Sequence, residues 1–354
     1  MKIDDVRIRT RVLRRRDTGW RTASYQAPEV TALYVGIEVE GVLGIGASAA
    51  HPRSLPPSSM VDQAEAVLRP ALVGQPLYGA PVRLAGLTGL HGRTRLAADL
   101  ALHDLLGKRA GVPAEVLWGG AVRQRVGVIR VIGLKEPEAV VDAVAPLREE
   151  GYRAFKVKIG DGIERDAERL RNVRSAFGAE VTITADANGH YSFEDCVALC
   201  ERIADLDLFC LEQPLDYADI EGMAALRRVT SVPIMADQSV ASAADAARVA
   251  ASGAADLIAV KLTKMGSVAE TSRAISVAAS LGVRAYLGGG AAPGIVDSAL
   301  TRLALTHANV ASYAEVGEAA ALVDDEVGGS RVAAGWAMSD ELPGLGGNPT
   351  VFAA

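Results

Sequence analysis

Three carboxylates and two lysines recur at nearly regular intervals in the second half of the chain: Lys158, Asp186, Glu212, Asp237 and Lys261. The intervals of 28, 26, 25 and 24 residues are close to the length of one strand, one helix and two loops. Each residue ends a short apolar run of strand character. If these runs are successive parallel strands of a barrel, all five side chains meet at its C-terminal rim, where such barrels keep their chemistry. The spacing predicts a divalent metal flanked by two amines.

The alternation of side chains along the runs points the charged groups inward. In the run over 154–159, Phe155 and Val157 share one strand face, whereas Lys156 and Lys158 share the other. The same alternation over 181–186 places Asp186 on the inner face. Ionised side chains are rarely buried without partners. Lysines opposite acids inside a barrel therefore indicate a reactive site rather than simple packing.

Length and composition predict an ordinary globular protein. The 354 residues suffice for a barrel of about 250 residues and a second domain of about 100. The net charge of -6 argues against a nucleic-acid partner. No apolar run is long enough for a bilayer, and the first residues resemble no signal segment, so we expect no membrane partner and a cytoplasmic location. The three cysteines fit neither a disulfide framework nor a zinc knuckle.

The pattern changes near residue 118. Residues 1–118 contain alternating segments broken by glycine and then helical stretches near 61–74 and 93–111, which predicts an α+β domain. Strand and helix patterns then alternate until eight strands are counted. We therefore expect an α/β fold, a modified TIM barrel of the (β/α)7β type over 119–327 with an N-terminal α+β capping domain. The tail, 328–354, is expected to pack back on the capping domain.

Six segments carry a resemblance to a known family: LALHDLLGKRAGVPAEVLWGG, FKVKIG, ADAN, LEQP, ADQS and IAVKLTKMGS. In this order and at these intervals they resemble the enolase superfamily, and within it the muconate lactonizing enzyme subgroup of the mandelate racemase and muconate lactonizing enzyme family. The resemblance implies that Mg²⁺, with Mn²⁺ as the alternative ion, is bound by Asp186, Glu212 and Asp237. It also implies that Lys158 and Lys261 are acid/base groups on opposite faces of a substrate that passes through an enediolate.

Further substrate contacts follow from the resemblance and from position. Lys156 is expected beside the substrate carboxylate or the metal, and Asn188 near the metal shell. Many relatives carry Glu where this chain has Gln238, so Lys261 lacks a negative neighbour there. Trp20 and His51 lie in loops that close over the barrel mouth in the family.

Three other positions have more than one interpretation. Gly289, within the run 288–290, could help to cradle a phosphate or let a substrate carboxylate approach the backbone. Glu315 is the carboxylate that the last strand offers, and it could pair with the cation of an N-alkylated amino acid. Lys264 could form a loop salt bridge or act in the site.

We therefore expect a racemase or epimerase that removes the proton next to the carboxylate of a small N-substituted amino acid or a related acid. A cycloisomerase or a dehydratase could use the same two lysines. Paired aspartates on the last strand, which dipeptide epimerases use, are absent from the sequence and disfavour a dipeptide. A Schiff-base aldolase and a non-catalytic carboxylate-binding protein are the other classes. The resemblance also implies a homo-oligomer, either a dimer or an octamer.

Overall fold

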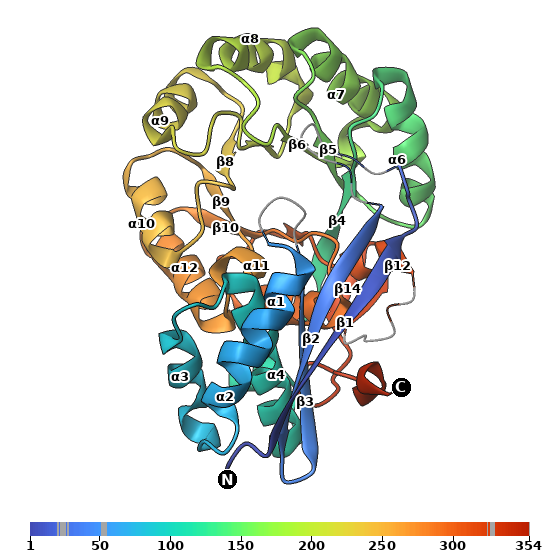
Figure 1. The fold of residues 1–354 in the computed structure, drawn as a ribbon. Helices are drawn as coiled ribbons and strands as arrows, with labels where there is room; N and C mark the ends of the chain where they lie inside the picture. Colours follow the sequence, from blue (N-terminus) through green and yellow to red (C-terminus); the bar gives the residue numbers. More distant parts are fainter. Residues whose placement is uncertain are drawn as a thin grey trace.

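The structure, a computed structural model, describes residues 1–19, 21, 26, 28–50, 55–323, 325 and 330–353, and within them eight parallel strands close into a barrel (Figure 1). The last strand of the barrel pairs with the first, since Ala314 is in register with Val128. On its other side the closing segment reaches the seventh strand, where the Ala311 amide donates to the Ala285 carbonyl at 2.8 Å. The strands are β4 (Val126–Ile132), β5 (Ala154–Lys158), β6 (Thr182–Asp186), β7 (Cys210–Glu212), β8 (Ile234–Ala236), β9 (Leu257–Val260), β10 (Arg284–Leu287) and β11 (Tyr313–Ala314).

Helices follow the strands and cover the outside of the barrel (Figure 1). Several begin with a side-chain cap. Ser192, Ser242 and Ser267, for example, accept hydrogen bonds from the amide three residues later, which satisfies a free donor of the first turn. The helices are α6 (Val140–Glu149), α7 (Ile163–Phe177), α8 (Phe193–Ile203), α9 (Ile220–Val229), α10 (Ala243–Ala251), α11 (Leu262–Met265), α12 (Val268–Ser280) and α13 (Gly294–Thr306), with short helical turns η3 (Pro137–Ala139), η4 (Gly178–Glu180) and η5 (Ala204–Leu206).

Strand alternation separates two apolar layers. Phe155 and Val157 belong to the large core between strands and helices, together with side chains such as Leu170 on α7. A smaller cluster of Ala154, Cys210, Met235 and other side chains fills the lumen. The lysines of β5 lie on the lumen face, as their alternation with Phe155 and Val157 predicts.

An antiparallel sheet and a set of helices form the capping domain. The sheet has the order β12-β1-β2-β3, built from β1 (Asp5–Arg15), β2 (Glu29–Val39), β3 (Val42–Ala49) and the later β12 (Leu322–Val323). The helical part contains α1 (Pro57–Gln63), η1 (Ala64–Leu68), α2 (Arg69–Leu72), η2 (Leu77–Gly79), α3 (Ala80–Gly86), α4 (Gly92–Ala110) and α5 (Ala114–Leu117). The predicted fold class, a modified barrel with an N-terminal α+β capping domain, is thus confirmed.

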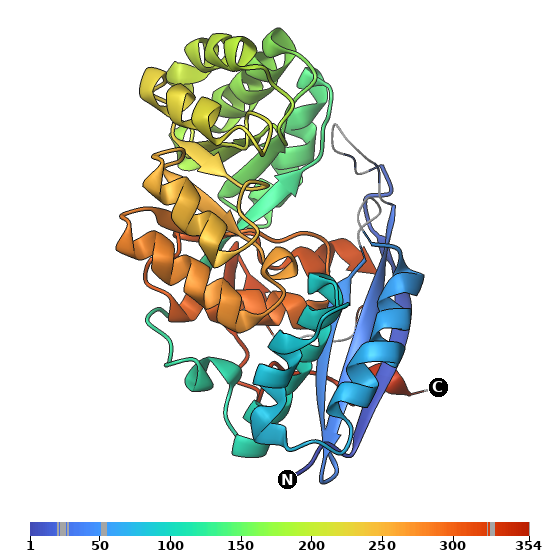
Figure 2. The ribbon, with the colours of Figure 1, turned by 60° about the vertical axis from the view of Figure 1, so that its left-hand side comes forward.

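Helix α4 lies between the capping sheet and the barrel (Figure 2). A Cβ atom at Gly46 of β3 would lie 2.1 Å from the Ala97 carbonyl, so the helix packs directly on the strand backbone. On the barrel side, Oδ2 of Asp99 accepts a hydrogen bond of 2.7 Å from the Val268 amide at the start of α12. Helix α4 therefore connects the capping domain to the segment that follows Lys261.

The tail contacts both parts of the molecule. Strands β13 (Ser330–Ala333) and β14 (Trp336–Ser339) form a hairpin that pairs with β4. After it, the Leu345 amide donates to Oδ1 of Asp104 on α4 at 2.8 Å. The guanidinium of Arg9 on β1 donates to the Val351 carbonyl within the last turn, η7 (Pro349–Phe352), at 3.0 Å. In the described part of the chain, none of the helices combines the length and apolar character that a membrane span requires.

Candidate active site

Strand register brings the predicted charged residues to one end of the barrel. Lys158 is in register with Asp186, and Asp186 is in register with Glu212, so these side chains end three neighbouring strands. Asp237 directly follows β8 and Lys261 directly follows β9. Parallel strands align their C-terminal ends, and the inward faces of adjacent strands then place these side chains side by side. All three carboxylates are at most 1% exposed.

The two predicted acid/base lysines come from strands on either side of β7, the strand that ends at Glu212. The Lys158 ammonium donates to Oδ2 of Asp186 and to Oδ1 of Asn188, the latter at 3.1 Å. Lys261 Nζ lies 2.7 Å from Oδ2 of Asp237 and 4.0 Å from Oε1 of Glu212. Both lysines line one cavity of about 990 Å³. The structure thus brings both amines to the C-terminal end of the barrel strands.

Lys156 lies deeper in the lumen and is 1% exposed. Its ammonium is 2.6 Å from Oε2 of Glu212, forms an ion pair with Glu315, and lies 5.3 Å from the centre of the Tyr286 ring. Burial opposes a charge on Lys156, but Glu212 and Glu315 outweigh it and hold the pKa of Lys156 well above its usual range. Glu212 and Glu315 thus favour the charged form of Lys156, which lines the cavity.

The three carboxylates are held by lysines. Among the described residues, no three acidic, imidazole or thiol groups are gathered closely enough to hold a metal ion as they stand. Asp186 and Glu212 are fully buried and lie outside the cavity wall, while ammonium groups bind their oxygens. For Asp186 and Asp237 to bind an ion together, Lys158 and Lys261 must move off them.

Glu212 nevertheless has the properties of a cation ligand. Both of its side-chain oxygens are buried. Oε2 lies 2.6 Å from the Lys156 ammonium, whereas Oε1 accepts no hydrogen bond from the described residues. Burial, reinforced by the charge of Asp186, raises the pKa of Glu212 to about 8 although Lys156 opposes the shift. A buried carboxylate with one oxygen that accepts no hydrogen bond, beside two more carboxylates, is a donor set of the kind that Mg²⁺ prefers. The residues present therefore fit the predicted ion.

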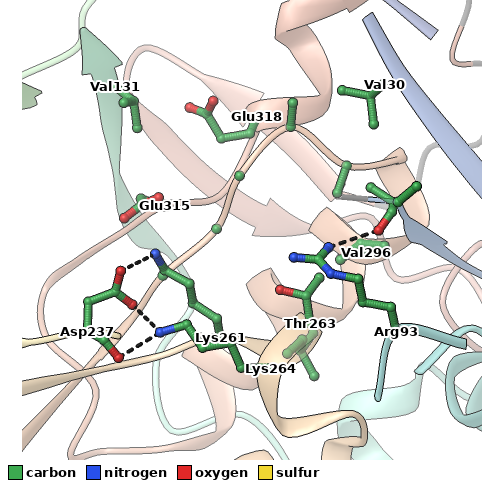
Figure 3. A pocket seen from close by; sticks show the side chains of 18 of the residues that line it. Val30, Arg93, Val131, Asp237, Lys261, Thr263, Lys264, Val296, Glu315 and Glu318 are labelled. Carbon is green, nitrogen blue, oxygen red and sulfur yellow. Dashed lines mark hydrogen bonds and ion pairs between the residues drawn. The ribbon is translucent and has the colours of Figure 1, made fainter. Parts of the chain in front are cut away.

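Lys264 binds Asp237 beside Lys261, through a different carboxylate oxygen (Figure 3). Its ammonium lies 2.6 Å from the Asp237 carbonyl and 2.5 Å from Oδ1. Burial opposes the charge on Asp237, but Lys261 and Lys264 outweigh burial and lower the pKa of Asp237. The loop salt bridge that the sequence left open for Lys264 is present, and it is made to a predicted metal ligand. Gln238 also lines the cavity, and its Oε1 is buried without a hydrogen bond from the described residues.

The glycine run 288–290, which follows β10, allows its backbone to pack closely against Glu315 and Lys261. A Cβ atom at Gly289 would lie 2.1 Å from the Glu315 carbonyl, and one at Gly288 would lie 2.6 Å from Cε of Lys261. Glu315 is 3% exposed, pairs with Lys156 and accepts a hydrogen bond of 3.2 Å from the Tyr286 hydroxyl. Its carboxylate is thus already engaged within the protein.

Sequence reasoning missed several side chains of this region. Glu318 lines the cavity and is 3.2 Å from the Arg130 guanidinium, and Arg93 enters from α4 (Figure 3). Tyr286 could have been found, because it shares the inner face of β10 with Gly288. Glu318 and Arg93 could not, because they lie outside the strand ends that the spacing identifies. The predictions for Trp20 and His51 fall outside the described residues.

Comparisons with known proteins decide the family. A family model described as "Enolase C-terminal domain-like" matches residues 139–350, which is more than half of the chain. The chain belongs to this family. A curated relative, the N-succinyl-L-Arg/Lys racemase of Bacillus cereus, is 26% identical over 317 residues, which cover 87% of this chain and 84% of the relative. Muconate cycloisomerase 1 of Pseudomonas putida is 28% identical over 257 residues, which cover 71% of this chain and 67% of the relative.

The fold agrees with that of solved members. The dipeptide epimerase of Enterococcus faecalis, solved with Mg and the dipeptide L-Leu-L-Tyr, has a TM-score of 0.92 at 25% identity, with 98% of this chain and 99% of that chain covered. The predicted resemblance to the mandelate racemase and muconate lactonizing enzyme family is confirmed. The relatives are racemases, epimerases and cycloisomerases, all of which are isomerases. This chain, a member of the same family, is an isomerase as well.

Proposed function

We propose that this protein is a racemase or epimerase in which Lys158 and Lys261 exchange the proton on the carbon next to a substrate carboxylate. The observation that carries the proposal is the placement of these two amines. They come from β5 and from the end of β9, which lie on either side of β7 and its Glu212 in the strand order, and they line the same cavity. An acid and a base that approach one carbon from opposite faces can invert its configuration.

The proton transfers require different charge states of the two lysines. A neutral amine removes the proton from one face of the carbon, and the protonated amine donates a proton to the other face. Removal of the proton spreads negative charge onto the substrate carboxylate as an enediolate, which nearby positive charge stabilises. Lys156, whose charged form Glu212 and Glu315 favour, supplies such a charge in the cavity wall.

The proposal includes Mg²⁺ bound by Asp186, Glu212 and Asp237, with Mn²⁺ as the alternative ion. When bound, the ion would supply Lewis-acid stabilisation of several kcal/mol to the substrate carboxylate. The buried Oε1 of Glu212, which accepts no hydrogen bond from the described residues, supports its presence. The structure of the Enterococcus faecalis epimerase, which was solved with Mg, supports it as well.

For the substrate we propose an N-acylated amino acid. The B. cereus relative is named for N-succinylated Arg and Lys. An acylated nitrogen carries no positive charge, and Glu315 is already paired with Lys156 and needs no substrate cation. The cycloisomerase relative favours a second candidate, the cyclisation of an unsaturated diacid by the same lysines. Assembly into a dimer or an octamer and a cytoplasmic location stay predictions.

Proton NMR in D₂O with Mg²⁺ tests the proposal. We expect N-succinyl amino acids of either configuration to lose the α-proton signal while their other resonances persist and the enantiomer accumulates. Conversion of cis,cis-muconate to a lactone without such exchange would instead support the cycloisomerase. A new olefinic product would indicate dehydration, and a lysine adduct trapped by borohydride would indicate Schiff-base chemistry. If the folded, Mg²⁺-supplied protein exchanges no α-proton across a panel of acylated amino acids, the racemase assignment is wrong.

A further inference from the structure

Gln213 directly follows the predicted ligand Glu212 and occupies an unusual position. It is fully buried, and its backbone φ is +39°, in the left-handed region that side-chain-bearing residues seldom adopt. Such a conformation persists only where surrounding contacts determine it.

The side-chain amide of Gln213 reaches across to the loop after β8. Its Oε1 accepts hydrogen bonds from the amides of Asp237, at 2.9 Å, and Ser239, at 3.1 Å. Its Nε2 donates to the Leu215 carbonyl at 3.1 Å and to the Ser239 hydroxyl oxygen at 3.0 Å. The amide thus fixes the backbone of Asp237 against the loop after β7.

The main chain of Gln213 extends the connection in both directions. Its carbonyl accepts a hydrogen bond of 2.7 Å from the Gly189 amide, in the loop after β6. Its amide donates to the Met235 carbonyl of β8 at 2.8 Å. Gln213 consequently joins the three loops that follow Asp186, Glu212 and Asp237.

Only a carboxamide of this length serves all these partners. A carboxylate would keep the acceptor for the two amides but would set an oxygen against the Leu215 carbonyl. An apolar side chain would leave the amides of Asp237 and Ser239 buried without an acceptor, which is costly. We infer that Gln213 is a positioning residue that fixes the backbone of the loops from which the three carboxylates extend, before an ion arrives. The inference rests on the proposed metal site.

The test compares the affinity of metal-depleted proteins for Mg²⁺ by isothermal titration calorimetry, and the coordination of Mn²⁺ by electron paramagnetic resonance. Gln213→Met keeps the length of the side chain and removes its hydrogen bonds. We expect its Kd for Mg²⁺ to rise by about 10–100-fold, as for other residues that orient ligands, and its Mn²⁺ spectrum to change.

Asn309→Leu is the matched control, because it removes an amide donor whose bond to the Val283 carbonyl, at 3.0 Å, lies at the other end of the barrel. We expect this variant to keep the wild-type Kd within twofold, even if it is less stable. A folded Gln213→Met with the same Kd and spectrum as the wild type would overturn the inference. Wild-type protein that binds neither ion would instead refute the metal site of the proposed function.

If Gln213→Met does not fold, hydrogen exchange of the metal-free wild-type protein tests the inference instead. Slow exchange over residues 236–240, unchanged by Mg²⁺, supports a site fixed in advance by Gln213. Fast exchange that slows only when Mg²⁺ is added shows that the ion, and not Gln213, orders this loop.

Discussion

At the scale of single residues, the two acid/base lysines are held by different partners. Lys158 contacts Asp186 and Asn188, whereas Lys261 contacts Asp237, with Glu212 farther away. Each lysine therefore depends on its own carboxylate for its position. If the lysines serve opposite faces of the substrate, removal of one should leave the chemistry of the other face intact.

This argument predicts an asymmetric result for Lys158→Met and Lys261→Met. Each variant should racemise about 10²–10⁴-fold more slowly than the wild type, because one proton-transfer group is lost. Each should still exchange the α-proton of one enantiomer with D₂O, and the two variants should prefer opposite enantiomers. Proton NMR of the separate D- and L-substrates measures this. Lys135→Met, a partly exposed lysine 3.6 Å from Asp17, is the control and should be unaffected. A single-lysine variant that racemises at the wild-type rate would contradict the assignment.

The residues of the site could be predicted from the sequence because strand spacing and alternation fix where side chains emerge. Lys158, Asp186 and Glu212 align for that reason. Pairing across the lumen could not be predicted. Lys156 pairs with Glu315, and Lys264 pairs with Asp237, because the fold brings these side chains together. The number of residues between them along the chain does not reveal this proximity.

At the scale of elements, the loop after β10 illustrates what sequence leaves undecided. The run 288–290 was compatible with phosphate binding or with close backbone approach. In the structure, Gly289 adjoins the backbone of Glu315, and Gly288 adjoins the side chain of Lys261. Helix α1 begins at Pro57, ahead of the helical pattern near residue 61, since proline is well suited to a first helical turn.

The glycine run predicts three different outcomes for three alanine substitutions. Gly289→Ala should destabilise the protein by about 1–3 kcal/mol, because its Cβ meets backbone that cannot withdraw. Gly288→Ala should cost less stability but lower turnover by about tenfold or more, because it displaces Lys261. Gly290→Ala, with nothing within 4 Å of its added Cβ, should be neutral in both respects. Urea unfolding and racemisation rates measure these effects, and equal effects at all three positions would contradict the packing argument.

At the scale of the whole molecule, one buried polar cluster joins the end of the barrel to the capping sheet. Asp297 on α13 accepts a hydrogen bond from the Ala319 amide, within the turn η6 (Glu318–Ala321) that leads to β12. Arg130 of β4 donates to the Gly317 carbonyl at 3.1 Å and pairs with Glu318. The segment that connects the barrel to the capping sheet thus packs against ionisable groups that are buried.

Asp297 should make stability depend on pH. Burial, with the charge of Glu318 adding to it, raises the pKa of Asp297 to about 8 from the ordinary 3.8, although the Ala319 amide and Arg130 oppose the shift. Between these values the folded protein keeps a proton that the unfolded chain has lost. The free energy of unfolding therefore falls as the pH rises from about 4 to about 8, by an amount on the order of a few kcal/mol, and this contribution is constant above that range.

Asp297→Asn isolates this contribution, because asparagine resembles the protonated acid and keeps an acceptor for the Ala319 amide. The variant should exceed the wild type in stability, measured by urea unfolding, by a clearly larger margin at pH 8 than at pH 5. Glu212 titrates in the same range in both proteins, so the difference between the two proteins reports on Asp297. Asp142→Asn, on the exposed face of α6, should shift stability equally at both pH values. A difference between wild type and Asp297→Asn that does not change with pH would show that Asp297 is ionised throughout, and that its buried charge is compensated by Arg130.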